Sequence, residues 1–276
     1  MEQRYATSPE QIPGMDTAGL RERYLVQDLF ADGEVKAVYT HHDRVVVAGI
    51  SPAGEPLTLP GFPEIRSDNF FDHREAGIVN VGGTGTVTVD GIEHTLTTGS
   101  CLYVGRGAVE VTFTSAGDAD LARFYLFSAP AHTAYPTSLV EAGQGTTREL
   151  GDPLTSNRRT LNQYIHENGV RSCQVVMGVT TLHPGSMWNT MPAHTHDRRT
   201  EVYLYFGLPA EARVVHLMGR PGETRHLVVG DREVVISPSW SVHSGVGTAS
   251  YSFVWAMAGE NQAFEDMDGF AIADMR

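Results

Sequence analysis

The sequence predicts an all-β protein made of two related β-barrels, with a short N-terminal helix in front of them. Short apolar runs separated by turn residues recur along most of the chain, which is typical of sandwiches and barrels. The 29 Gly and 14 Pro among 276 residues supply many turns. Local phrases also repeat, because residues 75–82 resemble 201–208 and residues 96–105 resemble 227–237. The repetition is why we expect two barrels of one kind.

The composition is that of a globular protein of small-molecule metabolism. Hydrophobic residues make up 41% and charged residues 19%, and the length allows a sizeable core. The net charge of -13 argues against binding to a nucleic acid or to an anionic membrane. Only Cys101 and Cys173 are present, and the chain shows neither a signal peptide nor a transmembrane run, so we expect a cytoplasmic protein. With Lys36 as the single lysine, Schiff-base catalysis is disfavoured.

The first elements are a helix and two strands. Residues 16–30 begin with an N-cap residue and carry apolar side chains at helical spacing, which predicts a helix. Strands are predicted at 35–39 and 45–50. His41 and His42 stand between them, and adjacent histidines on a strand face opposite ways, so the pair indicates a structural role rather than a metal site.

Strand follows strand through the rest of the chain. In the first half, strands are predicted at 77–81, 84–89, 93–96, 101–104, 109–114 and 122–127. In the second half, besides the strands around the metal motif described next, they are predicted at 173–182, 213–218, 224–229, 233–236 and 250–257. Residues 138–160 are richer in Gly, Thr and charge and show no apolar periodicity. We therefore expect one barrel in residues 1–150 and the other in residues 151–276.

Residues 191–206 have the pattern of a metal site. Residues two apart on an extended strand face the same side, so His194 and His196 present two imidazoles together. The polar residues after them fit a turn, and Glu201 opens the next strand beside the histidines. The candidate for a fourth ligand is His243.

Three neutral imidazoles and one carboxylate suit a divalent transition ion such as zinc, manganese or iron, with positions left open for water or substrate. At the matching places the first half offers only His73, Glu75 and Glu110. We therefore expect one metal ion per chain, in the second barrel, and a first barrel without metal.

The two metal segments resemble the metal motifs of the cupin proteins, although Trp240 stands where a cupin usually has Gly and predicts a different turn. Longer phrases are similar to the 5-keto-4-deoxyuronate isomerase family of pectin breakdown, over nearly the whole chain. These phrases are 155–160, 188–192, 223–226, 237–247, 259–262 and 266–268.

The resemblance implies a double-barrel cupin fold, with two jelly-roll-like barrels, and assembly as a homohexamer. It also implies a zinc ion held by His194, His196, Glu201 and His243. The family interconverts 5-dehydro-4-deoxy-D-glucuronate and 3-deoxy-D-glycero-2,5-hexodiulosonate, which is an aldehyde-to-ketone shift between adjacent carbons.

Such an isomerisation removes a proton beside a carbonyl and returns it one carbon away, with a metal ion as the electrophile. The base is left open among a metal-bound hydroxide, Glu201, Glu223 and a tyrosine on the face of Glu201, namely Tyr203. The planar fork of an arginine binds a carboxylate in a bidentate way. The candidates nearest the metal segments are Arg198, Arg199 and Arg225.

A solvated turn or a surface ion pair is the competing interpretation for each of these arginines. If none of them holds the substrate's carboxylate, Arg158, Arg159 or a neighbouring subunit is expected to do so. Trp188 and Trp240 either wall the substrate pocket or pack in the core.

Three alternatives to this function differ in what would identify them. A related sugar-acid isomerase, for example one that acts on a 5-deoxyglucuronate, has the same chemistry and is separated by its substrate. An iron-dependent cupin dioxygenase is identified by its metal and by oxygen consumption. A non-catalytic cupin that binds a uronate, or regulates through it, shows binding without turnover, and no basic DNA-binding segment accompanies it here.

Overall fold

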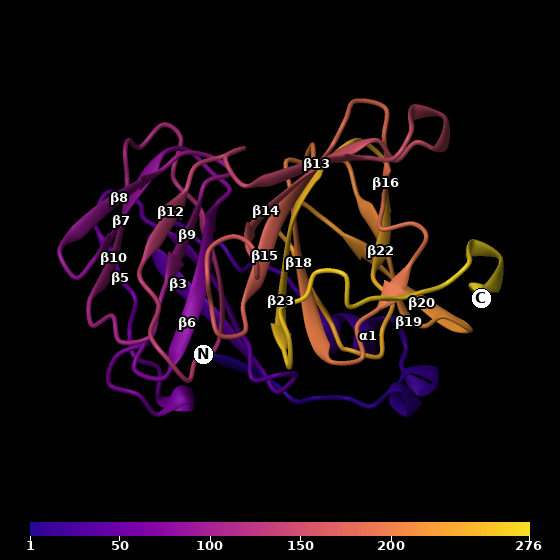
Figure 1. The fold of residues 1–276 in the computed structure, drawn as a ribbon, viewed down its shortest axis with the longest axis horizontal. Coiled ribbons are helices and arrows are strands. Elements are labelled where there is room, and N and C mark those ends of the chain that lie inside the picture. The colour runs from indigo at the N-terminus through magenta and orange to yellow at the C-terminus, as the bar shows by residue number, and fades with distance from the viewer.

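The computed structural model describes residues 1–276 and confirms the all-β prediction. Four sheets are stacked, and Figure 1 shows them in succession from the first half of the chain (indigo to magenta) to the second half (orange to yellow). Two large inner sheets pack against each other at the centre, and a smaller sheet covers the far face of each. Each half is therefore a two-sheet barrel, as expected.

The first half contains eleven strands in two sheets. The inner sheet has the order β1-β3-β4-β11-β6-β9-β12, and the outer sheet has the order β5-β10-β7-β8. The bounds of the inner strands are β1 Glu2–Arg4, β3 Glu34–Thr40, β4 Val46–Ser51, β11 Phe124–Pro130, β6 Arg74–Asn80, β9 Cys101–Val104 and β12 Ser138–Val140. Those of the outer strands are β5 Leu57–Thr58, β10 Val111–Ser115, β7 Gly85–Val89 and β8 Ile92–Leu96.

The second half repeats this plan. Its inner sheet has the order β13-β14-β15-β23-β18-β21-β2, its outer sheet has the order β16-β22-β19-β20, and β17 pairs with β24. The inner strands are β13 Thr146–Leu150, β14 Arg159–Ile165, β15 Val176–Leu182, β23 Ser252–Gly259, β18 Arg199–Phe206, β21 Val234–Ser237 and β2 Leu25–Val26. The others are β16 Trp188–Asn189, β22 Ser244–Gly247, β19 Val214–Arg220, β20 Glu223–Val229, β17 His194–Thr195 and β24 Asp268–Gly269.

Strand β18 is buried on both faces, because its alternate residues face two different cores. Val202 and Leu204 belong to the core between the two inner sheets. Tyr203 and Tyr205 point the other way, into the core of the second barrel. Since residues two apart share a face, Glu201 also points into this barrel.

The N-terminal helix is shorter than predicted. Helix α1 spans Thr17–Tyr24 rather than 16–30, and β2 follows it directly. Leu25 and Val26 pair with β21 of the second half, so they gain sheet hydrogen bonds and core contacts that continuing the helix would not provide. The other helical turns are 3-10, at η1 Pro9–Gly14, η2 Pro63–Ile65, η3 Pro153–Thr155 and η4 Ile272–Asp274. None of the helices combines the length and the apolar character that a membrane crossing requires.

Every predicted strand is present, with bounds that shift by a few residues. The sequence did not indicate β13 or β14, which lie in or directly after the segment that lacked apolar periodicity. It also missed several short strands, namely β1, β5, β12, β16, β22 and β24. The division of the chain at residue 150 stays a prediction, and strand pairing places both β13 and β2 in the sheet of the second half.

Candidate metal centre

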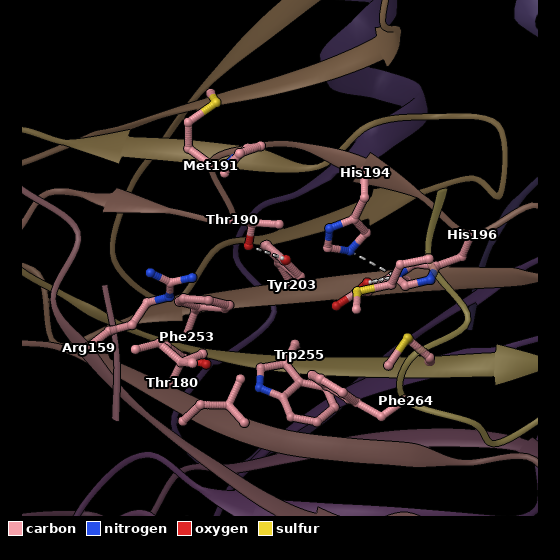
Figure 2. Close-up of a pocket in the computed structure, with 16 residues that line it drawn as sticks. Arg159, Thr180, Thr190, Met191, His194, His196, Tyr203, Phe253, Trp255 and Phe264 are labelled. Carbon is pink, nitrogen blue, oxygen red and sulfur yellow. Dashed lines mark hydrogen bonds and ion pairs between the residues drawn. The ribbon is translucent and has the colours of Figure 1, made fainter. Parts of the chain in front are cut away.

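The four predicted ligands lie together in the second barrel. Strand β17 carries His194, and His196 follows at the turn that leads into β18. Glu201 lies on the face of β18 that points into the barrel, and His243 directly precedes β22 of the outer sheet. Figure 2 shows His194 and His196 side by side at one end of the pocket.

The donor atoms of the four side chains lie within 4.8 Å of one another. Nε2 of His194 is 3.1 Å from Nε2 of His196 and 3.0 Å from Nε2 of His243. Oε2 of Glu201 is 2.8 Å from Nε2 of His196 and 2.9 Å from Nε2 of His243. Metal–ligand bonds of about 2.0–2.2 Å place neighbouring ligand atoms about 3–3.5 Å apart, which is close to this spacing. The donor set therefore fits one small divalent ion.

A backbone carbonyl fixes which nitrogen of His196 faces the cluster. Nδ1 lies 2.7 Å from the carbonyl oxygen of Asp266, and because that oxygen only accepts hydrogen bonds, Nδ1 carries the proton. Nε2 then presents its lone pair to the other ligands, as a metal ligand must. Arg199 donates to the same carbonyl through Nη2 at 2.9 Å and to the carbonyl of Ala263 through Nη1 at 2.8 Å.

The protonation states of His194 and Glu201 suit the binding of a metal ion. Burial, together with the neighbouring His243, lowers the pKa of His194 to about 2, so this ring is neutral at physiological pH. Burial acts to raise the pKa of Glu201, but the attraction of His243 and the hydrogen bonds with His196 and His243 outweigh it and hold that pKa well below its usual range. Neutral imidazole and ionised carboxylate are the forms that bind a metal ion.

The cluster stands at one end of a cavity of about 240 Å³ inside the second barrel. Strand register builds the wall, because paired residues of antiparallel strands face the same side of a sheet. The pairs that continue from β18 through β23 to β15 are Glu201–Met257, Tyr203–Trp255 and Phe253–Thr180. Phe264 and Met267 of the C-terminal segment complete the wall near the ligands. The result is a mostly apolar cavity with a few polar groups, as in small-molecule sites.

Tyr203, one of the predicted catalytic residues, lines this cavity. Its hydroxyl lies 3.1 Å from Oγ1 of Thr190, and its ring lies edge-on to the ring of His243. Burial and the charge of Glu201 raise the pKa of Tyr203 well above its usual value, so the hydroxyl keeps its proton at neutral pH.

The predicted base Glu223 and the predicted carboxylate ligand Arg225 lie outside the cavity. They pair with each other at 2.9 Å on β20, a strand at the edge of the outer sheet, because residues two apart on this strand share a face. The other two arginines lie behind the metal ligands. Arg198 is on the surface and donates through Nε to Asp266 Oδ2 at 3.0 Å, and Arg199 is buried against backbone carbonyls.

The two predicted pocket tryptophans also lie elsewhere. Trp240 packs edge-on against Tyr24 and donates Nε1–H to the carbonyl of Thr7 at 3.3 Å, so it anchors the N-terminal segment. Trp188 is half-buried on β16 and is not part of the cavity wall. The indole that does line the cavity belongs to Trp255 on β23.

The arginine that lines the cavity is Arg159, which the sequence indicated only as a second choice. It lies at the start of β14, two strands away from β23 in the inner sheet. Sheet pairing over long sequence distances brings it to the cavity, and no local spacing signals this. The same holds for Trp255 and Thr180.

Comparison with known proteins agrees with the resemblance found in the motifs. Residues 25–272 match the model of the KduI/IolB family. A protein of Kineococcus radiotolerans named 4-deoxy-L-threo-5-hexosulose-uronate ketol-isomerase is 78% identical, and the match covers 100% of both chains. A protein of the same name from Halalkalibacterium halodurans is 51% identical, again over 100% of both chains.

A solved structure shares the fold. An IolB-like protein of Salmonella typhimurium superposes with a TM-score of 0.71 at 18% sequence identity, and the match covers 90% of this chain and 96% of that one. The double-barrel cupin fold expected from the sequence is thereby confirmed.

Proposed function

The chain belongs to the KduI/IolB family, and from this membership and its ligand cluster we propose that it is a metal-dependent ketol-isomerase of uronate catabolism, as in pectin breakdown. Its reaction is the interconversion of 5-dehydro-4-deoxy-D-glucuronate and 3-deoxy-D-glycero-2,5-hexodiulosonate. The observation that carries the proposal is the convergence of three imidazoles and a carboxylate on a sugar-sized cavity, in a chain 78% identical to a relative named for this activity.

The residues that hold the ion are His194, His196, Glu201 and His243. We propose Zn²⁺, one per chain, with Mn²⁺ or Fe²⁺ as alternatives that suit the same donors. When bound, the ion supplies a Lewis acid that stabilises negative charge on the substrate oxygens beside the reacting carbons.

Glu201 and Tyr203 are the proposed proton-transfer pair. Glu201 is the carboxylate that lines the cavity, and Tyr203 is a lining hydroxyl whose ring contacts His243. Oε2 of Glu201 takes both histidine contacts, which leaves Oε1 as the oxygen available to accept a proton. Tyr203 keeps its proton and can donate a hydrogen bond to a substrate oxygen.

The proposed setting is a cytoplasmic homohexamer whose partner is a small sugar acid. The net charge of -13 supports a soluble partner over a nucleic acid or a membrane. Light scattering after size exclusion measures the assembly, and a monomer would contradict it.

The test of the function is incubation with the unsaturated uronate breakdown product, followed by NMR. We expect conversion that a chelator stops and added Zn²⁺ restores. A 5-deoxyglucuronate serves as the competing substrate, and preferential turnover of it would point to the related isomerase instead. No conversion after reloading with Zn²⁺, Mn²⁺ or Fe²⁺ would reject the proposed activity.

A further inference from the structure

The cavity has a second polar end, away from the metal ligands. Figure 2 shows Arg159 and Thr180 on the opposite side of Tyr203 and Trp255 from His196. The guanidinium of Arg159 has one hydrogen bond to the protein, from Nη1 to the carbonyl of Asn157 at 2.8 Å. It has no ion pair with any carboxylate, although it is half-buried. A desolvated cation in this situation favours an anionic ligand.

The other arginines around the metal centre differ in this respect. Arg198 is neutralised by Asp266, and Arg225 by Glu223. Arg199 donates through Nη1 and Nη2 to two backbone carbonyls and is not part of the cavity wall. Arg159 is thus the cavity's cation, with most of its donors still free.

Two buried polar atoms of other residues that line the cavity lack a hydrogen-bond partner in the protein. They are Oγ1 of Thr180 and Nε1 of Trp255, and both residues line the cavity with 1% and 2% of their surface exposed. Buried donors in folded proteins are almost always satisfied, so unpaired ones in a cavity point to a ligand. In Figure 2 the indole nitrogen lies on the edge of the ring that faces Thr180.

A close approach between strands holds the indole in this place. Gly178 pairs with Trp255 across β15 and β23, and a Cβ on Gly178 would lie 2.3 Å from Cζ2 of the indole. The ring therefore lies over a residue that has no side chain. This packing fixes the orientation of the ring, whose nitrogen only donates hydrogen bonds.

We propose that Arg159, Thr180 and Trp255 form a carboxylate subsite that takes the acid end of the sugar. All three groups can donate hydrogen bonds, and the arginine fork matches the two oxygens of a carboxylate. The apolar side chains of Leu161 and Phe253 lie beside them and strengthen the attraction by excluding water.

This subsite rests on the proposed function, and it gives the substrate a direction. In 5-dehydro-4-deoxy-D-glucuronate the carboxylate and the aldehyde stand at opposite ends of the carbon chain. With the acid held at Arg159, the aldehyde and its neighbouring hydroxyl carbon reach the end of the cavity where His194, His196 and Glu201 lie. The reacting carbons then meet the metal ligands and Tyr203.

The test uses the metal-loaded enzyme and two ligands that cannot isomerise, D-gluconate and its neutral counterpart D-glucitol, with affinities measured by calorimetry. Arg159→Gln removes the positive charge, and Arg159→Lys keeps the charge but removes the planar guanidinium. Thr180→Val removes the hydroxyl, and Trp255→Phe removes the indole N–H. Arg220→Gln is the control, because Arg220 forms an exposed ion pair with Glu10 on the outside of the barrel. Thermal unfolding checks that each variant is folded.

We expect Arg159→Gln to weaken gluconate binding by at least about tenfold, because charged bidentate hydrogen bonds are lost. Each of the other cavity variants should weaken it by about threefold, because each loses part of the hydrogen bonding. Glucitol binding and the control should stay within about twofold of wild type, since the alcohol has no charge to pair. Equal gluconate affinity in wild type and all four cavity variants would overturn the subsite.

Turnover of the uronate separates this inference from the proposed function. If the wild type binds gluconate through Arg159 but converts no uronate, the isomerase proposal fails and the subsite stands. If the wild type is active and Arg159→Gln keeps its KM, the subsite fails and the isomerase proposal stands. We expect KM to rise with a smaller change in kcat, because the carboxylate is held alike in ground and transition states.

Discussion

At the residue scale, contacts with the protein and with one another orient the candidate metal ligands. The carbonyl of Asp266 fixes the tautomer of His196, and Arg199 holds that carbonyl in place. Glu201 lies between His196 and His243, within 2.9 Å of each. An ion bound here therefore meets side chains already in their ligand conformations, and the loss of any ligand leaves the others pre-organised but too few.

The first prediction concerns the ligands themselves. His196→Ala or His243→Ala should lower metal affinity and turnover by more than about 100-fold, because even partners behind a ligand contribute 10–100-fold. The fold should survive, since the apolar clusters of the first barrel and between the halves do not include the four candidate ligands. Circular dichroism, size exclusion and metal analysis measure this, with His226→Ala on the exposed face of β20 as the control. Aggregation of the ligand variants would instead indicate a structural metal.

The second prediction concerns His42, which lies far from the cluster in sequence and accepts a hydrogen bond from the backbone N–H of Thr7 at 3.3 Å. Burial lowers its pKa from 6.5 to about 4. Since the unfolded chain then binds the proton more tightly, stability is complete above pH 6.5 and is lost as the pH falls from 6.5 to about 4. The loss should amount to about 2–3 kcal/mol over this window.

Urea unfolding at pH 7 and pH 5, with chelator present, measures the effect. His42→Gln keeps an acceptor for the N–H of Thr7 but does not titrate, so the variant should lose less stability than wild type between the two pH values. All other side chains are the same in both proteins, so their contributions cancel in the comparison. An equal loss in both would contradict the role assigned to His42.

The cluster of candidate metal ligands could be predicted from the sequence because its signals are local. His194 and His196 are two residues apart, which puts both on one face of an extended segment, and Glu201 lies near the start of the strand that follows. The carboxylate subsite could not be predicted in this way. Arg159 and Trp255 reach one cavity only through the order β14-β15-β23, which spacing along the chain does not contain.

At the element scale, the inner sheet of the second barrel determines the shape of the cavity. Strands β18, β23 and β15 present alternate residues to the cavity and to the core between the halves. At the pair Gly178–Trp255 the large ring is accommodated because its partner has no side chain. The width of the cavity thus depends on a glycine in the middle of a strand.

The third prediction is that Gly178→Ala distorts this sheet. Its Cβ would lie 2.3 Å from both the Trp255 ring and the carbonyl oxygen of Asn162, so the ring or the strand must move. We expect the unfolding free energy to fall by about 1–3 kcal/mol, as in other overpacked cores. Gly222→Ala, which meets no atom within 4 Å, is the control. Urea unfolding compares the two, and equal stability would contradict the close packing.

The elements themselves could be predicted where the apolar pattern was long. Long strands rich in buried apolar residues, such as β23, were found, whereas two-residue strands such as β16 and β24 have no period to detect. The predicted helix was too long because Leu25 and Val26 continue its apolar spacing. In the structure these two residues form a strand that pairs with β21. Such tertiary pairing overrides a weak local preference.

At the scale of the whole molecule, the two barrels share a core. Residues of both inner sheets form one apolar cluster, and a Cβ on Gly77 of the first half would lie 2.5 Å from Sδ of Met177 in the second. A buried carboxylate joins the halves as well. Glu75, the counterpart of Glu201 in the repeat, accepts hydrogen bonds from the hydroxyl of Tyr103 at 2.8 Å and from backbone N–H groups of the second half.

Those backbone donors belong to three consecutive residues. The N–H of Cys173 donates to Oε2 of Glu75 at 2.7 Å, and the N–H groups of Gln174 and Val175 donate to Oε1 at 2.7 and 2.9 Å. The carboxylate therefore has its oxygens occupied by donors of the protein. The repeat has kept an acid at this position, where it ties the chain entering β15 to the first barrel.

The last prediction follows from this arrangement. Glu75→Gln places an amide N–H₂ among N–H donors, so at least one buried donor loses its acceptor and the charge-assisted bonds disappear. The unfolding free energy should fall by about 2–5 kcal/mol, whereas Tyr103→Phe, which removes one bond, should cost about 1–2 kcal/mol.

Because the core is continuous across the inner sheets, both variants should still unfold in a single transition at a lower urea concentration. Circular dichroism and tryptophan fluorescence follow the unfolding, with Glu93→Gln on the exposed strand β8 as the control. Two separate transitions in the wild type would show that the barrels fold independently. If Glu75→Gln were as stable as the control, the Glu75 carboxylate would not contribute to the stability of the interface between the barrels.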